Sequence, residues 1–135
     1  MTALAADRPT PARDNKDFEF PVAAATKIYA GAIVALSATG YATKGATATT
    51  LKAAGVAQAL ADNSAGADGA INVKVKRGVF RFANSASADL IARTEIGADC
   101  YIVDDQTVAK TNGTGTRSIA GKVRDVDSIG VWVEF

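Results

Sequence analysis

The sequence contains no histidine and only one cysteine, Cys100, among its 135 residues. Without histidine the chain cannot form a Ser-His-Asp or Cys-His catalytic site, or a zinc site of the usual Cys/His type. A single cysteine cannot form a disulfide within the chain, so the fold does not depend on an oxidising compartment. We expect Cys100 to be a small buried hydrophobic residue, and we predict neither a metal nor a cofactor.

A strong charge of either sign is also missing, because the formal net charge is +1. Nucleic-acid binding normally needs a clustered basic excess. Lys74, Lys76, Arg77 and Arg81 follow one another closely, but no aromatic residue for base stacking shares their face before Gly78. We interpret this stretch as a solvated strand face or a surface facing an acidic partner, and we predict no nucleic-acid partner.

Long apolar runs are absent too. The longest, residues 28–36, is far too short to span a bilayer. The first 16 residues carry charges and prolines where a signal peptide would have an apolar core. The sequence therefore predicts no membrane partner and no export.

All three prolines lie within residues 1–21, which show no apolar period before Phe18 and Phe20. We predict an extended N-terminal arm over this range, followed by a single β domain over residues 22–135. The arm is either a disordered terminus or a segment that orders on a partner. Arg8, Arg13, Phe18 and Phe20 are its candidate contact residues.

Residues 71–82 (INVKVKRGVFRF) show the clearest strand pattern. Ile71, Val73 and Val75 alternate with polar residues, which is the period of a strand with one buried face. After Gly78 the apolar positions move to even numbers, as a β-bulge would cause. We predict one long strand with a bulge near Gly78.

Shorter strands are expected on both sides of this one. Apolar residues of both parities predict a central strand over 26–36. Residues 83–92 form the best helix candidate. Further strands are expected at residues 41–44, 55–61, 100–103, 107–110, 119–126 and 129–135, and a helical turn is the alternative for residues 55–61. The fold class predicted is mainly β: a β-sandwich or jelly-roll-like barrel of short antiparallel strands with at most one short helix.

A weak internal sequence repeat supports two similar β units. Gly31, Lys44 and Gly55 recur as Gly97, Lys110 and Gly121, each 66 residues later (97 − 31, 110 − 44 and 121 − 55). Matching residues in one ungapped register across three elements indicate two packed units of similar strand order.

Paired carboxylates are the remaining chemical candidates, and we interpret them as turn residues. Asp104 and Asp105 stand where a turn is expected, and Asp125 with Asp127 shows no other catalytic feature. Residues 62–69 have oxygen ligands at alternate positions but lack the acid count of a calcium loop. We predict that the chain is not an enzyme, and that loops 62–69 and 111–116 tolerate insertions.

Five stretches together resemble a known family: YAGAIVAL, AAGVAQALADN, INVKVKRGVFRF, IGADCYIVDD and AGKVRDVDSIGVWVEF. Their order of strands and glycines is similar to that of the capsid decoration (cement) proteins of tailed bacteriophages. The resemblance covers about residues 16–135. It implies a non-enzymatic virion protein on the outer capsid surface, made in the host cytoplasm, whose partner is the major capsid protein. A carbohydrate-binding or tail accessory module and a carboxylate-dependent hydrolase remain the alternatives.

The last strand suggests self-association. Ile129, Val131 and Val133 share one parity and are expected to face the core, which turns Trp132 and Glu134 outward. Outward tryptophans are enriched at interfaces. We predict that Trp132 and Glu134 contact the capsid or a second copy; the alternative is that a second layer of the same chain, such as the arm, covers Trp132. A homodimer is favoured, and a homotrimer is the alternative.

Overall fold

Short antiparallel strands are the main regular structure in the computed structural model, which describes residues 2–135. The strands are β1 Asp17–Pro21, β2 Thr26–Ile28, β3 Ile33–Leu36, β4 Ala42–Lys44, β5 Lys52–Ala57, β6 Ala61–Asn63, β7 Asn72–Lys76, β8 Val79–Phe82, β9 Asp99–Ile102, β10 Val108–Ala109, β11 Ile119–Asp127 and β12 Gly130–Glu134. The helical turns within the described range are two short 3₁₀ turns, η1 Ser87–Asp89 and η2 Arg93–Glu95.

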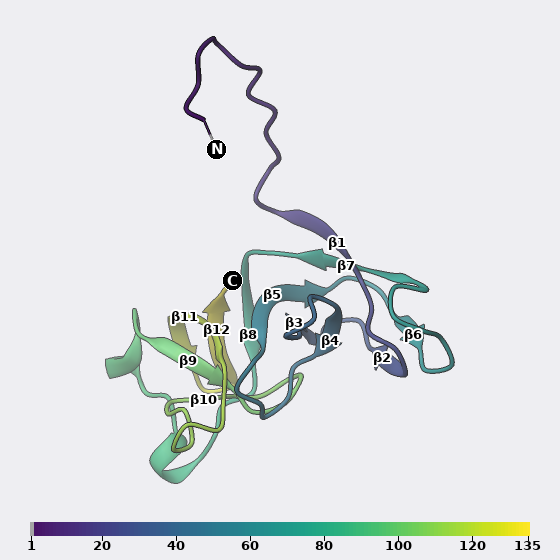
Figure 1. Cartoon of the computed structure of the whole chain (residues 1–135). Coiled ribbons are helices and arrows are strands. Elements are labelled where there is room, and N and C mark those ends of the chain that lie inside the picture. Colours follow the sequence, from purple (N-terminus) through teal and green to yellow (C-terminus); the bar gives the residue numbers. More distant parts are fainter. Residues whose placement is uncertain (1) are drawn as a thin grey trace.

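The strands form two five-stranded sheets and one two-stranded sheet (Figure 1). The N-sheet has the order β1-β7-β5-β3-β4, and the C-sheet has the order β10-β9-β11-β12-β8. Strands β2 and β6 pair separately. The sheets are not closed into a barrel, so the predicted mainly β class is confirmed in its sandwich-like form.

Two hydrophobic clusters lie on opposite faces of the N-sheet. Ile33 and Ala35 of β3 belong to the cluster that also contains Val131 and Val133 of the C-sheet. Val34, between them in sequence, belongs to the second cluster, which includes Ile28 and Ala61 of the β2–β6 pair. Strand β3 is therefore buried on both faces, which explains why its sequence is apolar at both parities.

The two large sheets repeat one topology. Strands β1, β3, β4, β5 and β7 take the same places in the N-sheet as β8, β9, β10, β11 and β12 take in the C-sheet. One irregularity also matches: an extra residue, Ala54, interrupts the β3–β5 ladder, and Ala120 interrupts β9–β11 at the equivalent point. The predicted pair of similar β units is thus present in the structure.

The predicted long strand over residues 71–82 is wrong. Its two halves, β7 and β8, belong to different sheets, and the chain passes between them at Arg77 and Gly78. Gly78 has a φ of 154°, which a residue with a side chain rarely adopts. The shift of apolar phase at this glycine marks a corner between sheets rather than a bulge.

Two other segments and one residue also differ from expectation. Residues 26–36 form two strands, β2 and β3, separated by a turn in which Gly31 has a φ of 88°. Residues 83–92 contain no α-helix, because the Asn84 side chain bonds to both the N–H and the C=O of Ile91 and closes a loop. Ile129 is not in the core but is 68% exposed at the β11–β12 turn.

Candidate interaction surfaces

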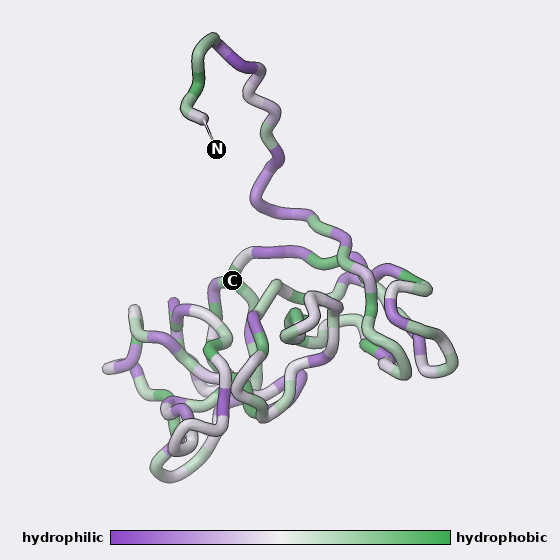
Figure 2. Tube along the Cα trace, in the orientation of Figure 1, coloured by the Kyte–Doolittle hydropathy of each residue, from purple (hydrophilic) through white to green (hydrophobic). Residues whose placement is uncertain are grey.

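Residues 2–16 extend away from the folded body as an arm. All of them are exposed, they contain no strand or helix, and Leu4 is 73% exposed (Figure 1). Figure 2 shows that the stretch of the arm that leads into β1 is hydrophilic. The only side-chain hydrogen bond found within residues 2–16 runs from the Arg8 guanidinium to the Pro9 carbonyl. Fifteen residues can reach about 50 Å when fully extended, so the arm can contact a partner well beyond the body.

Residues 17–21, the last part of the predicted arm, are a strand of the N-sheet. Strand β1 pairs with β7 from Asp17 opposite Lys76 to Pro21 opposite Asn72. Phe20 packs against the second hydrophobic cluster, and the rings of Phe18 and Phe20 stack with centroids 5.9 Å apart. Phe20 is therefore held by its own chain.

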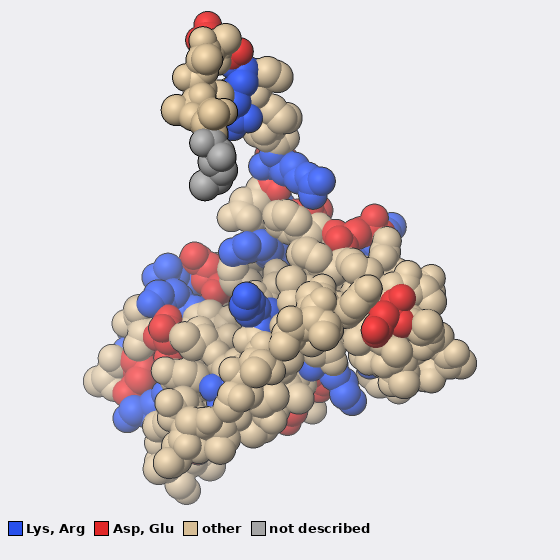
Figure 3. All heavy atoms as spheres, viewed as in Figure 1, with Lys and Arg blue, Asp and Glu red and all other residues tan. Residues whose placement is uncertain are grey.

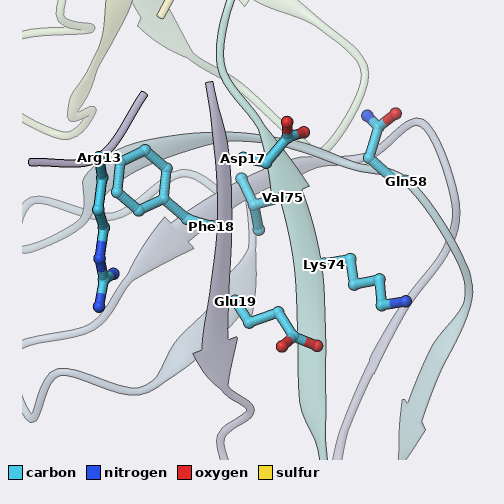
Figure 4. Close-up of a pocket in the computed structure, with 7 residues that line it drawn as sticks. All are labelled: Arg13, Asp17, Phe18, Glu19, Gln58, Lys74 and Val75. Carbon is cyan, nitrogen blue, oxygen red and sulfur yellow. The ribbon is translucent and has the colours of Figure 1, made fainter. Parts of the chain in front are cut away.

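A surface hollow lies where the arm joins β1. Phe18 and Arg13 line it together and lie side by side in Figure 4. The other lining residues are Asp17, Glu19, Gln58, Lys74 and Val75. The hollow thus combines side chains of both charges with a half-buried aromatic ring.

The arm and the end of the chain meet at the corner between the sheets. The Arg77 N–H donates to the Lys16 carbonyl at 2.7 Å, and the Phe135 N–H donates to the Gly78 carbonyl at 2.9 Å. The predicted contact residues Arg13 and Glu134 thus lie on segments that converge at Arg77 and Gly78.

Trp132 lies on the outward face of the C-sheet, as predicted, while Val131 and Val133 are fully buried. Its Nε1–H donates to Asp127 Oδ2 at 2.9 Å, and the Arg81 guanidinium lies 5.9 Å from its ring centroid. The hydrogen bond from Trp132 lowers the pKa of the Asp127 carboxyl. Beside it, Glu134 pairs with Arg124 at 3.0 Å. Trp132 is half-buried, and its polar atom is satisfied within the chain.

The acidic residues considered for catalysis serve turns and strands. Asp104 Oδ1 accepts the Gln106 N–H, and Asp125 Oδ1 accepts the Val126 N–H. The pKa of Asp127 is lowered, whereas a general acid needs a raised one. Within residues 2–135 no three His, Cys, Asp or Glu side chains are grouped to hold a metal ion.

The loop over residues 62–69 is mostly exposed, but hydrogen bonds tie it to the segment around residues 22–25. Asn63 is buried, and its Nδ2 donates to the carbonyls of Val22, Ala23 and Ala67. Asp68 Oδ1 accepts the Ala24 N–H at 2.7 Å. The oxygen atoms that resemble calcium ligands in the sequence therefore bind the chain itself.

No family model, characterised protein or solved structure in the comparisons matches this chain. None of the helical segments over residues 2–135 is long and apolar enough to cross a membrane. Acidic and basic side chains are intermixed on the face of the body that Figure 3 shows.

Proposed function

We propose that the protein is a bacteriophage capsid decoration protein. It binds the outer surface of an assembled icosahedral shell and stabilises contacts between neighbouring major capsid subunits. The observation that carries this proposal is the exposed arm over residues 2–16, which is joined by β1 to a sandwich-like body. A fixed body with a long flexible extension can bridge two subunits of a lattice.

The mechanism is mass action. A protein that binds the assembled lattice and not the free subunits stabilises the lattice by the free energy of its binding. Many weak contacts repeated by symmetry add up to a large effect on the shell. The body needs only rigidity for this role, which two sheets around a shared core supply.

The shell-facing side consists of the arm, its base and the adjoining chain end. Arg8 and Arg13 supply positive charge along the arm, and Phe18 supplies a partly exposed ring at its base. Trp132 and Glu134 belong to the C-sheet strand that ends at the same corner. The ordering of a mobile arm on binding lowers the affinity per contact but lets it follow the shell surface.

Co-sedimentation with expanded particles of the phage that encodes the protein tests this proposal. The full chain should pellet with particles at saturable stoichiometry. Deletion of residues 1–16 should weaken binding at least about tenfold, while the unfolding temperature should fall only slightly, because residues 2–16 are all exposed and touch the body only near their end, at Arg13 and the Lys16 carbonyl. A matched control replaces residues 2–16 with a glycine-serine segment of equal length. A full chain that does not pellet, or a truncated chain that pellets equally well, contradicts the proposal.

A further inference from the structure

The β2–β6 pair is an addition to the first β unit. The second unit has no separate two-stranded sheet, although its five main strands match those of the first. The inner face of the pair carries Ile28, Ala61 and Asn63, all of which are buried. In Figure 1 the pair lies at the side of the molecule away from β9 and β10.

Four residues of the pair and its ends are considered for its outer face: Lys27 and Asp62 within the strands, and Tyr29 and Leu60 just beyond them. Lys27 of β2 is directly opposite Asp62 of β6. Tyr29 follows Ile28 and Leu60 precedes Ala61, so these two side chains flank the last pair of the ladder. Tyr29 is 58% exposed and Leu60 is 56% exposed. The Lys27 Nζ lies 5.1 Å from the centroid of the Tyr29 ring, which places one charge beside the apolar row.

We propose that this face binds a second copy of the same chain across a two-fold axis. An axis between β2 and β6, parallel to the strands, places Lys27 of one copy against Asp62 of the other. The same rotation places Tyr29 against Leu60. Each charged residue then meets the opposite charge, and each exposed apolar side chain meets the other. This matching is the condition for a self-complementary two-fold interface.

The arrangement of charges on this face favours a second copy of the chain over a different partner. The face carries one positive and one negative residue beside two exposed apolar side chains, so it is neutral as a whole and complementary to its own rotated image. Tyrosine is enriched at the centres of such contacts. Four side chains bury little area, so the dimer is weak and forms at high concentration. The inference does not depend on the proposed function.

Charge-reversal variants test the interface by sedimentation velocity over a range of concentrations. The wild type should show concentration-dependent dimers. Lys27→Asp makes the face wholly acidic and Asp62→Lys makes it wholly basic, so each variant alone should dimerise at least about tenfold more weakly. An equimolar mixture of the two variants should regain dimers. Lys52→Asp, which changes an exposed lysine on β5, is the matched control and should behave as wild type.

Two further variants cover the case in which charge reversal loosens the β2–β6 pair. Tyr29→Ser and Leu60→Ser keep both charges and should also weaken dimerisation. A wild type that stays monomeric at millimolar concentration, a trimer, or a mixture that does not associate overturns the inference. So does a variant that loses particle binding while its self-association is unchanged, because the face then binds another protein.

Discussion

Gly55 and Gly121, 66 residues apart, occupy the same position in the two sheets. Each follows the extra alanine of a bulge and lies under the carbonyl of a neighbouring strand. A Cβ atom on Gly55 would lie 2.6 Å from the Lys76 carbonyl oxygen, and one on Gly121 would lie still closer to the carbonyl oxygen of Glu134. The close approach of backbone in both sheets explains why the glycine recurs.

Substitution of either glycine should therefore destabilise the fold. Gly55→Ala combines a backbone clash with a φ of 143°, so we expect a loss of about 3 kcal/mol or more in the free energy of unfolding, measured by urea denaturation. Gly97→Ala is the control. Its φ is 95° but nothing lies within 4 Å of the added atom, so the loss should be about 1 kcal/mol. Equal losses for the two variants would contradict the close approach.

The two polar loops should respond differently to insertion. A short glycine-serine insert between Thr114 and Gly115 should leave the unfolding temperature nearly unchanged, because the bonds that it separates, from Gly115 to Asn112 and from Thr116 to Gly113, are exposed to solvent, whereas Asn63 is buried. The same insert after Gly66 should lower it, since it separates Asn63 from the Ala67 carbonyl that it binds. Thermal unfolding followed by circular dichroism measures both. A tolerated insert after Gly66 would show that the Asn63 contacts do not matter.

Trp132 should control the ionisation of Asp127. Trp132→Phe removes the Nε1–H donor, which is the main cause of the lowered carboxyl pKa, so that pKa should rise toward its ordinary value. Because the folded-state pKa is lowered, Asp127 stabilises the protein above its unfolded pKa, and this contribution is lost as the pH falls through the folded value. When the pH falls below about 4, the free energy of unfolding should decrease less for this variant than for the wild type. NMR titration of Asp127 gives the pKa directly, and an unchanged value would rule out the Trp132 bond as its cause.

Cys100 should be unreactive in the folded protein. It is fully buried, and burial raises the pKa of its thiol to about 11. The thiolate is the reactive form, so alkylation at pH 8 should proceed at the rate of unfolding and become fast in urea. A raised folded-state pKa also means that stability falls as the pH rises above the unfolded value of about 8.5. Mass spectrometry after timed labelling tests this, and rapid labelling of the native protein would place Cys100 at the surface.

The sequence repeat predicted more of the fold than any single strand pattern. The 66-residue spacing identified equivalent strands because insertions are absent between Gly31 and Gly55 and between their counterparts. The two phenylalanines of β1 are equivalent to the two of β8, but the 66-residue spacing does not reveal this. Phe18 and Phe80 differ by 62 residues (80 − 18), so the segment between this strand and the next has changed length in one unit.

The errors arose where tertiary contacts decide between local alternatives. The shift in the numbering of apolar residues at Gly78 fits a β-bulge and a corner between sheets equally well. Only the pairing of β8 with a second sheet distinguishes the two. Alanine-rich residues 83–92 favour a helix, but the Asn84 side chain bonds to Ile91 within the segment and Ser85 bonds to the distant Val108 carbonyl, and these bonds hold the segment in a loop. The β2–β6 pair was missed because strands of three residues show no measurable period.

The outward position of Trp132 and the extended segment before β1 could be predicted from sequence, because both signals are local: an even-numbered residue in a strand whose odd-numbered residues are apolar, and a proline-rich, charged N-terminal segment. The pairing of Tyr29 with Leu60 could not be predicted in this way. The two residues are 31 positions apart (60 − 29), and their proximity follows from the register of β2 and β6.

Particle stability tests the central claim most directly. Expanded particles stripped of the protein should be heated with increasing amounts of the purified full chain, and the temperature of disassembly should be recorded by light scattering. A cement protein raises this temperature with its free concentration and then saturates, because it binds the assembled lattice alone. The chain that lacks residues 1–16 should raise it much less at equal concentration. A disassembly temperature that does not change at saturating full-length protein would contradict the proposed function.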